Sequence, residues 1–292
     1  MIISSSLNNI KESKFINHFI SILRENPITF FAFLMLFFFI ITAILGPYLV
    51  PYDPLETNAK IALQPPSIEH LFGTDNLGRD VFSRVIVATR LDLTISVLAV
   101  LMSFIIGSFL GALAGYWGGW LDVFLSRILD TIMAFPLFVL AMGIVAALGN
   151  TIENIIYATA IINIPFYARL VRAEVNIRRE ASFVHAAKMA GNSEFKILTI
   201  HIFPNTLPPM MVQVSLNLGW AILNAAGLSF IGLGVRPPTP EWGIMVAEGA
   251  NFIISGEWWL ALFPGLWLML AVLTFNFLGD GLRDIFDPRK RV

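Results

Sequence analysis

Long stretches without charge constrain this sequence more than any other feature. Six intervals between charged side chains contain 27, 29, 22, 15, 39 and 22 uncharged residues, in chain order. A helix needs roughly 20 apolar residues to cross the hydrocarbon core of a bilayer. The fourth interval is short and needs a turn from each flank, whereas the fifth holds one span with flanking turns. The sequence therefore predicts an all-α integral membrane protein with six transmembrane helices, at residues 28–50, 93–115, 129–149, 152–172, 207–233 and 258–280.

The composition agrees with a membrane location. Hydrophobic residues make up 57% of the chain and charged residues 13%, and the mean hydropathy is +0.75. A soluble domain carries about 25% charged residues. The chain has no cysteine, which excludes disulfides and thiolate metal sites. The first apolar run is too long for the core of a signal peptide, so we expect it to be retained.

The predicted spans divide the chain into four parts. These are a cytoplasmic N-terminal segment, the first span with a long external segment, a five-span permease core and a cytoplasmic tail, at residues 1–27, 28–90, 91–282 and 283–292. Within the external segment, Val81, Phe82, Val85 and Ile86 have the spacing of an amphipathic helix. We expect this helix either to lie on the outer leaflet or to cap a translocation path.

Lysine and arginine residues are distributed unevenly between the two sides of the predicted membrane. If both termini are cytoplasmic, 14 of the 19 basic residues lie inside and 5 lie outside. Cytoplasmic loops of membrane proteins carry an excess of these residues. The bias therefore predicts cytoplasmic termini, a cytoplasmic location for residues 183–205, and external locations for the segments around Arg79 and Pro238.

The spans contain few groups that could bind an ion. Asp130, Glu153 and Asp280 lie at span ends, whereas ion-coupled carriers place acidic or histidine side chains near the middle of the membrane. The chain also has no Gly-Lys pair, so it lacks a phosphate-binding loop, and its four histidines form no H-E-x-x-H motif. We therefore expect no catalytic residue, no bound cofactor or metal and no nucleic-acid partner, and an external energy source for uphill transport.

The fifth predicted span carries a row of neutral polar side chains. Gln213, Asn217 and Asn224 are spaced by four and seven residues, which puts them on one helical face, and Trp220 lies between them. Buried amides in hydrocarbon need a partner or water. The face either lines a water-filled route beside a partner subunit or forms interhelical hydrogen bonds.

The second predicted span contains small residues at four-residue intervals. They are Ser103, Gly107, Gly111 and Gly115. Small residues on one face let helix backbones approach closely. We expect this face to pack within the chain, and contact with a second membrane subunit is the alternative.

Residues 183–205, "FVHAAKMAGNSEFKILTIHIFPN", read as a helix, a glycine and a second helix. Gly191 suits the position after a helix end, where a left-handed backbone is needed. Asn192 or Ser193 can cap the next helix, which is expected to end at Pro204. The bend is expected to present small residues, namely Ala186, Ala187, Ala190 and Gly191. Such a surface suits a partner protein, and an interfacial helix on the bilayer is the alternative.

This segment resembles a known family. His185-Ala186-Ala187, then Gly191, then Pro204 reproduce the spacing of the "EAA" signature found in membrane subunits of binding-protein-dependent, ATP-driven importers. His185 replaces the usual glutamate, and His201 replaces the first aliphatic residue. Three further segments, "FGTDNLGRDVFSR", "LSFIGLGVRPPTPEWG" and "LGDGLRDIFDPR", resemble the C-type subunit of dipeptide, oligopeptide and nickel importers.

The resemblance implies a set of partners and site residues. It implies a bacterial inner-membrane permease that pairs with a second permease, with two cytoplasmic ATPases that bind ATP and magnesium, and with an external solute-binding protein. Together with the polar spacing, it leads us to expect three groups of site residues. The expected ATPase-coupling residues are Phe183, His185, Ala186, Ala187, Gly191, Asn192 and Pro204. The expected translocation-path residues are Gln213, Asn217, Trp220 and Asn224. The expected external gate and binding-protein contacts are Arg79, Asp80, Arg84, Pro238, Glu241 and Trp242.

The expected function is therefore peptide import. Within transport, the alternatives are import of nickel or a metal chelate and import of glutathione. From another class, the alternative is a stand-alone channel or facilitator, which would need neither a coupling helix nor ATPase partners.

Overall fold

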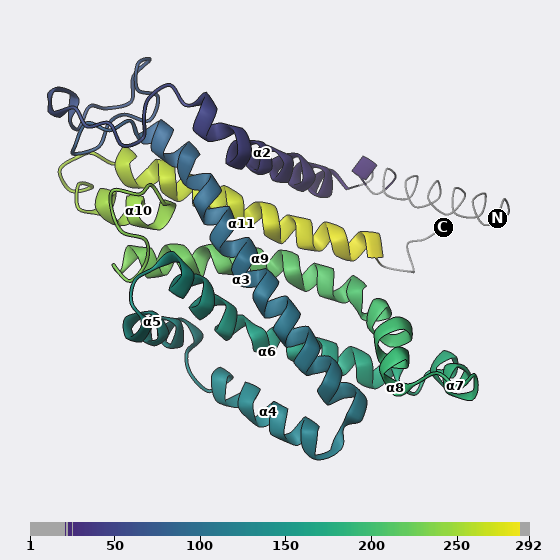
Figure 1. The fold of residues 1–292 in the computed structure, drawn as a ribbon. Helices are drawn as coiled ribbons and strands as arrows, with labels where there is room; N and C mark the ends of the chain where they lie inside the picture. The colour runs from purple at the N-terminus through teal and green to yellow at the C-terminus, as the bar shows by residue number, and fades with distance from the viewer. Residues whose placement is uncertain (1–20, 22, 25, 287–292) are drawn as a thin grey trace.

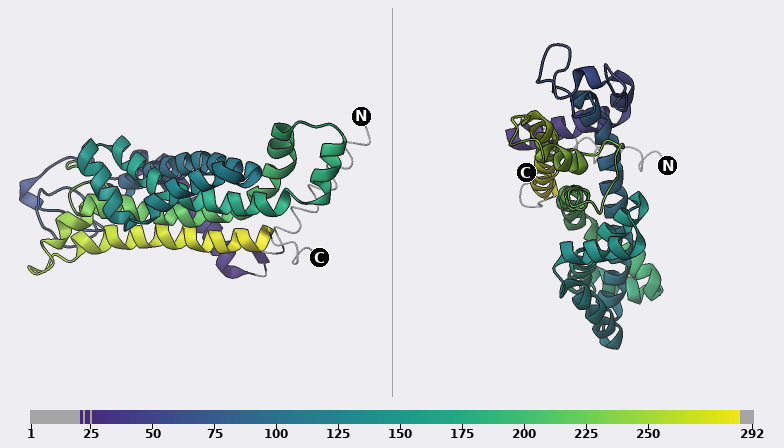
Figure 2. Two further views of the ribbon diagram at one scale, coloured as in Figure 1. Left: turned by 90° about the horizontal axis from the view of Figure 1, so that it is seen from below. Right: turned by 90° about the vertical axis from the view of Figure 1, so that its left-hand side faces the viewer.

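The computed structural model describes residues 21, 23, 24 and 26–286. Long helices lie side by side and connect two ends of the molecule (Figure 1). At one end, here called the loop end, lie residues 50–80 and α10 (Trp242–Ala250). At the other, here called the bend end, lie α7 (Ser182–Met189) and α8 (Glu194–Lys196) (Figure 2). The expected segment 1–27 falls almost entirely outside the described residues, as do residues 287–292 of the expected tail.

Five described helices are long and apolar enough to cross a membrane, and a bent pair could make a sixth span. The predicted all-α membrane fold is confirmed. The five are α2 (Pro27–Leu49), α3 (Val81–Trp117), α6 (Ile152–Arg178), the helical run Glu194–Phe230 that includes α9 (Leu207–Phe230), and α11 (Trp259–Phe286). The bent pair is α4 (Gly119–Met133) and α5 (Leu137–Leu148).

The first and last spans meet at the bend end. The Asn26 side chain caps α2 by accepting from the backbone N–H of Ile28 at 3.1 Å, as expected for an N-cap residue. Its Nδ2 also donates to Asp284 Oδ2 of α11 at 3.3 Å. The start of α2 and the end of α11 therefore lie on the same side of the bundle, as an even number of spans requires.

A single helix, α3, replaces two expected elements. The prediction of a separate amphipathic helix before residue 90 is wrong, because α3 runs unbroken for 37 residues, or about 55 Å. No proline or glycine interrupts its first 26 residues. The charged Arg84 and Asp92 of this helix are buried.

The glycine row of α3 packs against α6. A Cβ added to Gly107 would lie 2.6 Å from the Ile164 carbonyl oxygen, and one added to Gly115 would lie 2.7 Å from that of Arg172. Neither position has room for a side chain. The expected packing within the chain is confirmed, and close packing fixes α3 against α6 along the bend-end half of both helices.

The expected span 129–149 corresponds to a bent pair of helices. The chain forms α4 and α5, which meet at an angle of 87°. Pro136 lacks a backbone N–H and disfavours helical geometry in Phe135, which accounts for the break. Arg172 of α6 donates through Nη2 to Asp122 Oδ2 of α4 at 2.7 Å, so the charges of α4 pair with α6.

Three further boundaries differ from the prediction. The expected domain limits at residues 90 and 282 fall inside α3 and α11. Pro204 does not end a helix, because the run continues through a π-helical turn (Ile197–Ile202) and a 3₁₀ turn (Phe203–Thr206) into α9. Such turns change the usual hydrogen-bond register and accommodate the missing N–H of a proline. The short helix α10 was not predicted at all.

Candidate coupling and translocation sites

The bend end is built around Gly191. Its φ is +77°, in the left-handed region that glycine adopts readily. The N–H of Asn192 donates to the Ala187 carbonyl at 3.2 Å, and that of Gly191 donates to Lys188 at 2.9 Å, the pattern of a Schellman helix end. Ser193 then caps α8. The predicted helix, glycine and second helix are confirmed.

The inner face of the bend is a hydrophobic core of its own. Val184 and Ala187 of α7 are buried in a cluster with Ile197, Ile202 and Val171. Ala187 was expected on the approachable surface, and this expectation is wrong. Helical spacing puts positions 184 and 187 on one face, and that face packs against the chain itself.

The outer face of the bend leaves large apolar side chains exposed. Phe183, Met189 and Phe195 are 44%, 91% and 67% exposed. Of the other predicted coupling residues, His185, Ala186, Gly191 and Pro204 are exposed and Asn192 is partly buried. The Asn192 amide donates to the Ala187 carbonyl at 3.0 Å, so it stabilises the bend internally. The bend projects beyond the long helices (Figure 2).

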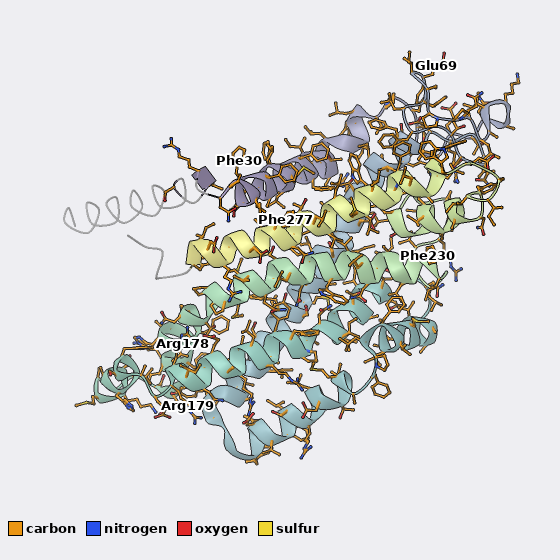
Figure 3. The ribbon with its side chains drawn as sticks, turned by 180° about the vertical axis from the view of Figure 1, so that it is seen from behind. Phe30, Glu69, Arg178, Arg179, Phe230 and Phe277 are labelled. Carbon is orange, nitrogen blue, oxygen red and sulfur yellow. The ribbon has the colours of Figure 1, made fainter. Side chains whose placement is uncertain are left out.

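Polar contacts tie the bend to α3. The Tyr116 hydroxyl donates to the Glu194 carboxylate, and Lys188 Nζ lies 3.7 Å from the same group. Arg179 donates through Nη1 to the Gly115 carbonyl at 3.2 Å. Figure 3 shows Arg178 and Arg179 at this end and Glu69 at the opposite end. A movement of the bend would therefore act on the end of α3.

The loop end contains a buried network of two arginines and two acids. Arg79 donates through Nε to Asp75 Oδ2 at 2.6 Å, and its Nη2 lies 3.7 Å from Glu248 of α10. Arg84 is 1% exposed and donates through Nη1 to the carbonyls of Pro54 and Pro238, at 3.1 and 3.3 Å. A cavity of about 20 Å³ beside Arg84 has room for about one water.

Other predicted external residues cap and join helices. Asp80 caps α3 by accepting from Ser83 N at 2.7 Å, and its Oδ1 lies 2.9 Å from His70 Nδ1. Glu241 caps α10. Trp242 donates through Nε1 to the Val85 carbonyl of α3 at 3.1 Å.

The expected surface role of most of these residues needs correction. Arg79, Asp80, Arg84, Glu241 and Trp242 are all buried, with at most 3% exposure. In this conformation they hold the loop end together and offer no surface to a binding protein. Of the six predicted residues, Pro238 is the exposed one.

The polar face of α9 is mostly inside the bundle. Asn217 and Asn224 are buried, Gln213 is partly buried, and Trp220 is exposed. Gln213 Nε2 donates to Asn217 Oδ1 at 2.9 Å, and Asn224 Nδ2 donates to the Trp220 carbonyl at 3.0 Å. The amides thus bond within α9, and buried Asn217 Nδ2 has no hydrogen-bond partner among the described residues. A role of this face in translocation stays a prediction.

Sequence reasoning missed several residues of the loop end. Asp75, Glu248 and His70 join the buried network, and Asp92 accepts from the Trp242 N–H at 3.2 Å. The only local sequence signal for this region was Glu241 ahead of an apolar run. That pattern is typical of a helix start and indicates the start of α10. Among the described residues, no three or more His, Asp or Glu side chains are grouped as a metal site would require.

A bundle of five or six membrane-length helices, with a folded bend projecting at one end and packed loops at the other, defines a multi-pass membrane protein. Residues 107–292 match the model of a family described as the binding-protein-dependent transport system inner membrane component. Residues 15–66 match the N-terminal transmembrane domain of oligopeptide transport permease C. The chain belongs to the family of binding-protein-dependent inner membrane transport components.

Individual relatives cover most of the chain. The dipeptide transport system permease protein DppC of Alkalihalophilus pseudofirmus is 45% identical over 92% of this chain and 88% of its own length. The probable D,D-dipeptide transport system permease protein DdpC of Escherichia coli is 42% identical over 91% of this chain and 89% of its own. The glutathione transport system permease protein GsiD of Pectobacterium atrosepticum is 42% identical over 83% of this chain and 80% of its own.

Proposed function

We propose that this chain forms part of the membrane path of an ATP-driven peptide importer. The main support for this proposal is the bend end. There Phe183, Met189 and Phe195 expose apolar surface on a folded segment that contacts α3. Exposed apolar surface rimmed by polar groups is typical of a protein interaction site. Family membership supports a transport subunit, and the bend supplies the surface through which an ATPase would drive it.

The coupling pathway follows from the contacts of the bend. In the proposed complex, two ATPases bind ATP and magnesium, and one of them seats the bend in a groove. Movement of the bend would reach α3 through Tyr116, Glu194 and the Arg179–Gly115 contact. Because α3 continues unbroken to the loop end, it can transmit this movement across the membrane as one rigid element.

The orientation of the complex follows from charge. Arg169, Arg172 and Arg178 lie on the bend-end half of α6, and Arg179 is its C-cap residue. Such residues favour the cytoplasmic side. The bend end and both termini are therefore proposed to be cytoplasmic. The loop end would face the external solute-binding protein, and a second permease would complete the path beside this chain.

The proposed substrates are short peptides. Relatives at 42 to 45% identity carry dipeptide names, while a glutathione permease is also similar. Neutral polar groups on α9 suit a route with little selectivity of its own. Nickel or a metal chelate is the alternative cargo, and a stand-alone channel is the alternative from another class.

Reconstitution in proteoliposomes tests this function. The chain would be assembled with its partner permease, ATPases and binding protein, and uptake of labelled dipeptide, tripeptide, glutathione and nickel would be compared with and without ATP. Peptide uptake that requires ATP and the binding protein is expected. ATP-dependent uptake of nickel or glutathione alone would reassign the cargo, and uptake by this chain without ATPases would contradict the importer.

A further inference from the structure

Two carboxyl groups meet inside the loop end. Asp92 of α3 is 1% exposed, and Glu241, which precedes α10, is fully buried. Asp92 Oδ2 accepts from the backbone N–H of Trp242, the residue after Glu241, so the two carboxyl groups share one buried site. Ionised carboxylates only accept hydrogen bonds, so a bond between two carboxyl groups needs a proton on one of them.

No cation compensates this pair. The charged and titratable groups on the surrounding elements are Asp75, Arg79 and Asp80 of the loop, Arg84 and Arg90 of α3, Arg236 before α10, Glu248 of α10 and Glu257 before α11. Among the described residues, the ion pairs of these groups join them to partners other than Asp92 and Glu241. The facing helix α9 is uncharged. Two negative charges in one buried site would repel each other strongly.

The donors around the pair indicate where the proton lies. Glu241 accepts from Gly243 N through Oε1 at 2.9 Å and from Ile244 N through Oε2 at 2.8 Å. Burial raises the pKa of the Glu241 carboxyl, and the hydrogen bonds that it receives offset this only in part. Asp92 accepts from Trp242 N through Oδ2 at 3.2 Å, whereas its Oδ1 receives no N–H or O–H among the described residues. A proton on Asp92 Oδ1 satisfies this atom by donating to Glu241.

We infer that Asp92 and Glu241 bind one proton between them and that this proton joins the start of α10 to α3. The site takes a proton as its ligand and does not depend on which substrate is transported. Loss of the proton would leave two buried negative charges, which would separate α10 from α3 and loosen the loop end. Glu248 would still face Arg79 and Arg84, and Trp242 Nε1 would still donate to the Val85 carbonyl.

The direction of the pH dependence follows from linkage. An unfolded carboxyl releases its proton above about pH 4, while the folded pair keeps one. The folded state therefore binds more protons, and its stability falls as pH rises, by roughly tenfold in the unfolding equilibrium constant per pH unit. This contribution is fully present at low pH and is lost as the folded pair releases its proton.

Infrared spectroscopy of the complete transporter in nanodiscs tests the proton directly. The carbonyl band of a buried protonated carboxylic acid would be followed between about pH 6 and about pH 10, in H₂O and D₂O. Asp92→Asn mimics the protonated acid, because its amide oxygen accepts from Trp242 N and its NH₂ donates to Glu241. Glu69→Gln at the exposed tip of the loop end is the matched control (Figure 3).

The expected result has three parts. The wild type shows the acid band at neutral pH and loses it on alkaline titration, Asp92→Asn folds without it, and Glu69→Gln retains it. The roughly tenfold change in the unfolding equilibrium constant per pH unit is also lost in Asp92→Asn. The inference is overturned if the wild type lacks the band, if Asp92→Asn keeps it, or if Asp92→Asn fails to fold, because a proton-sharing pair accepts an amide at this position.

Discussion

The Tyr116 hydroxyl at the end of α3 donates a hydrogen bond to the Glu194 carboxylate of the bend. The two residues are 78 positions apart in the sequence, so the contact is tertiary and joins the exposed bend to the longest described helix. It is a direct connection between the proposed ATPase surface and the helix that reaches the loop end.

Tyr116→Phe removes this contact and leaves the aromatic ring in place. A single hydrogen bond contributes about 1 kcal/mol net, so local opening of the bend should become about fivefold more frequent. Amide hydrogen exchange over residues 182–196 measures this opening. Tyr157→Phe, an exposed tyrosine of α6, is the matched control and should leave the exchange unchanged.

The neighbouring alanines 186 and 187 should respond in opposite ways to tryptophan. Ala187 is buried in the core of the bend, so Ala187→Trp overpacks it, at a cost of about 1–3 kcal/mol. Ala186 is exposed, so Ala186→Trp should leave the bend folded and weaken ATPase binding at least about tenfold. Limited trypsin digestion reports folding and co-purification reports binding. Equal effects of both variants on digestion would contradict the burial of Ala187.

The close approach of α3 and α6 makes a glycine necessary. Gly107→Ala places a methyl group against the Ile164 carbonyl and should destabilise the chain by about 2 kcal/mol. Gly143 of α5 has open space around its Cβ position, so Gly143→Ala should be neutral or stabilising by up to about 1 kcal/mol. Thermal unfolding of the detergent-purified transporter compares the two. If Gly107→Ala unfolded at the same temperature as the wild type, the close packing of α3 against α6 would be contradicted.

Local features of the fold could be predicted from the sequence where interactions between nearby residues determine them. Gly191 and Ser193 were read correctly as a helix end and a cap, because each acts on backbone groups within five residues. The break at Pro136 could not be predicted from the proline alone, because Pro165 and Pro264 lie inside α6 and α11 without ending these helices. The tertiary surroundings decide which proline is tolerated.

Long-range burial accounts for the larger errors at the loop end. Arg84 and Asp92 look like residues of an aqueous segment until Pro238 and Trp242 meet them from about 150 positions away. Arg79 likewise lies 3.7 Å from Glu248 of α10, which explains why a residue expected on the surface lies inside. No periodicity within α3 contains this information.

The buried ion pair at the loop end should be essential for its folding. Asp75→Asn removes the negative charge that pairs with Arg79 and faces Arg84. Only the more distant Glu248 would then face the two buried arginines, and breaking a buried pair costs about 3 kcal/mol. Chemical unfolding monitored by tryptophan fluorescence would detect the loss, and the exposed Glu69→Gln should leave stability unchanged. An Asp75→Asn variant as stable as the wild type would show that the network is not needed.

Site-directed cross-linking tests the central claim most directly. The chain has no cysteine, so Met189→Cys gives one attachment point at the tip of the bend, where Met189 is 91% exposed. Ile254→Cys gives a matched point at the loop end, where the side chain is 99% exposed. A photoactivated cross-linker at position 189 in the assembled transporter should capture an ATPase subunit, in a yield that changes with ATP, while position 254 should not. Capture of an ATPase from position 254, or of only lipid or the external binding protein from position 189, would contradict the account.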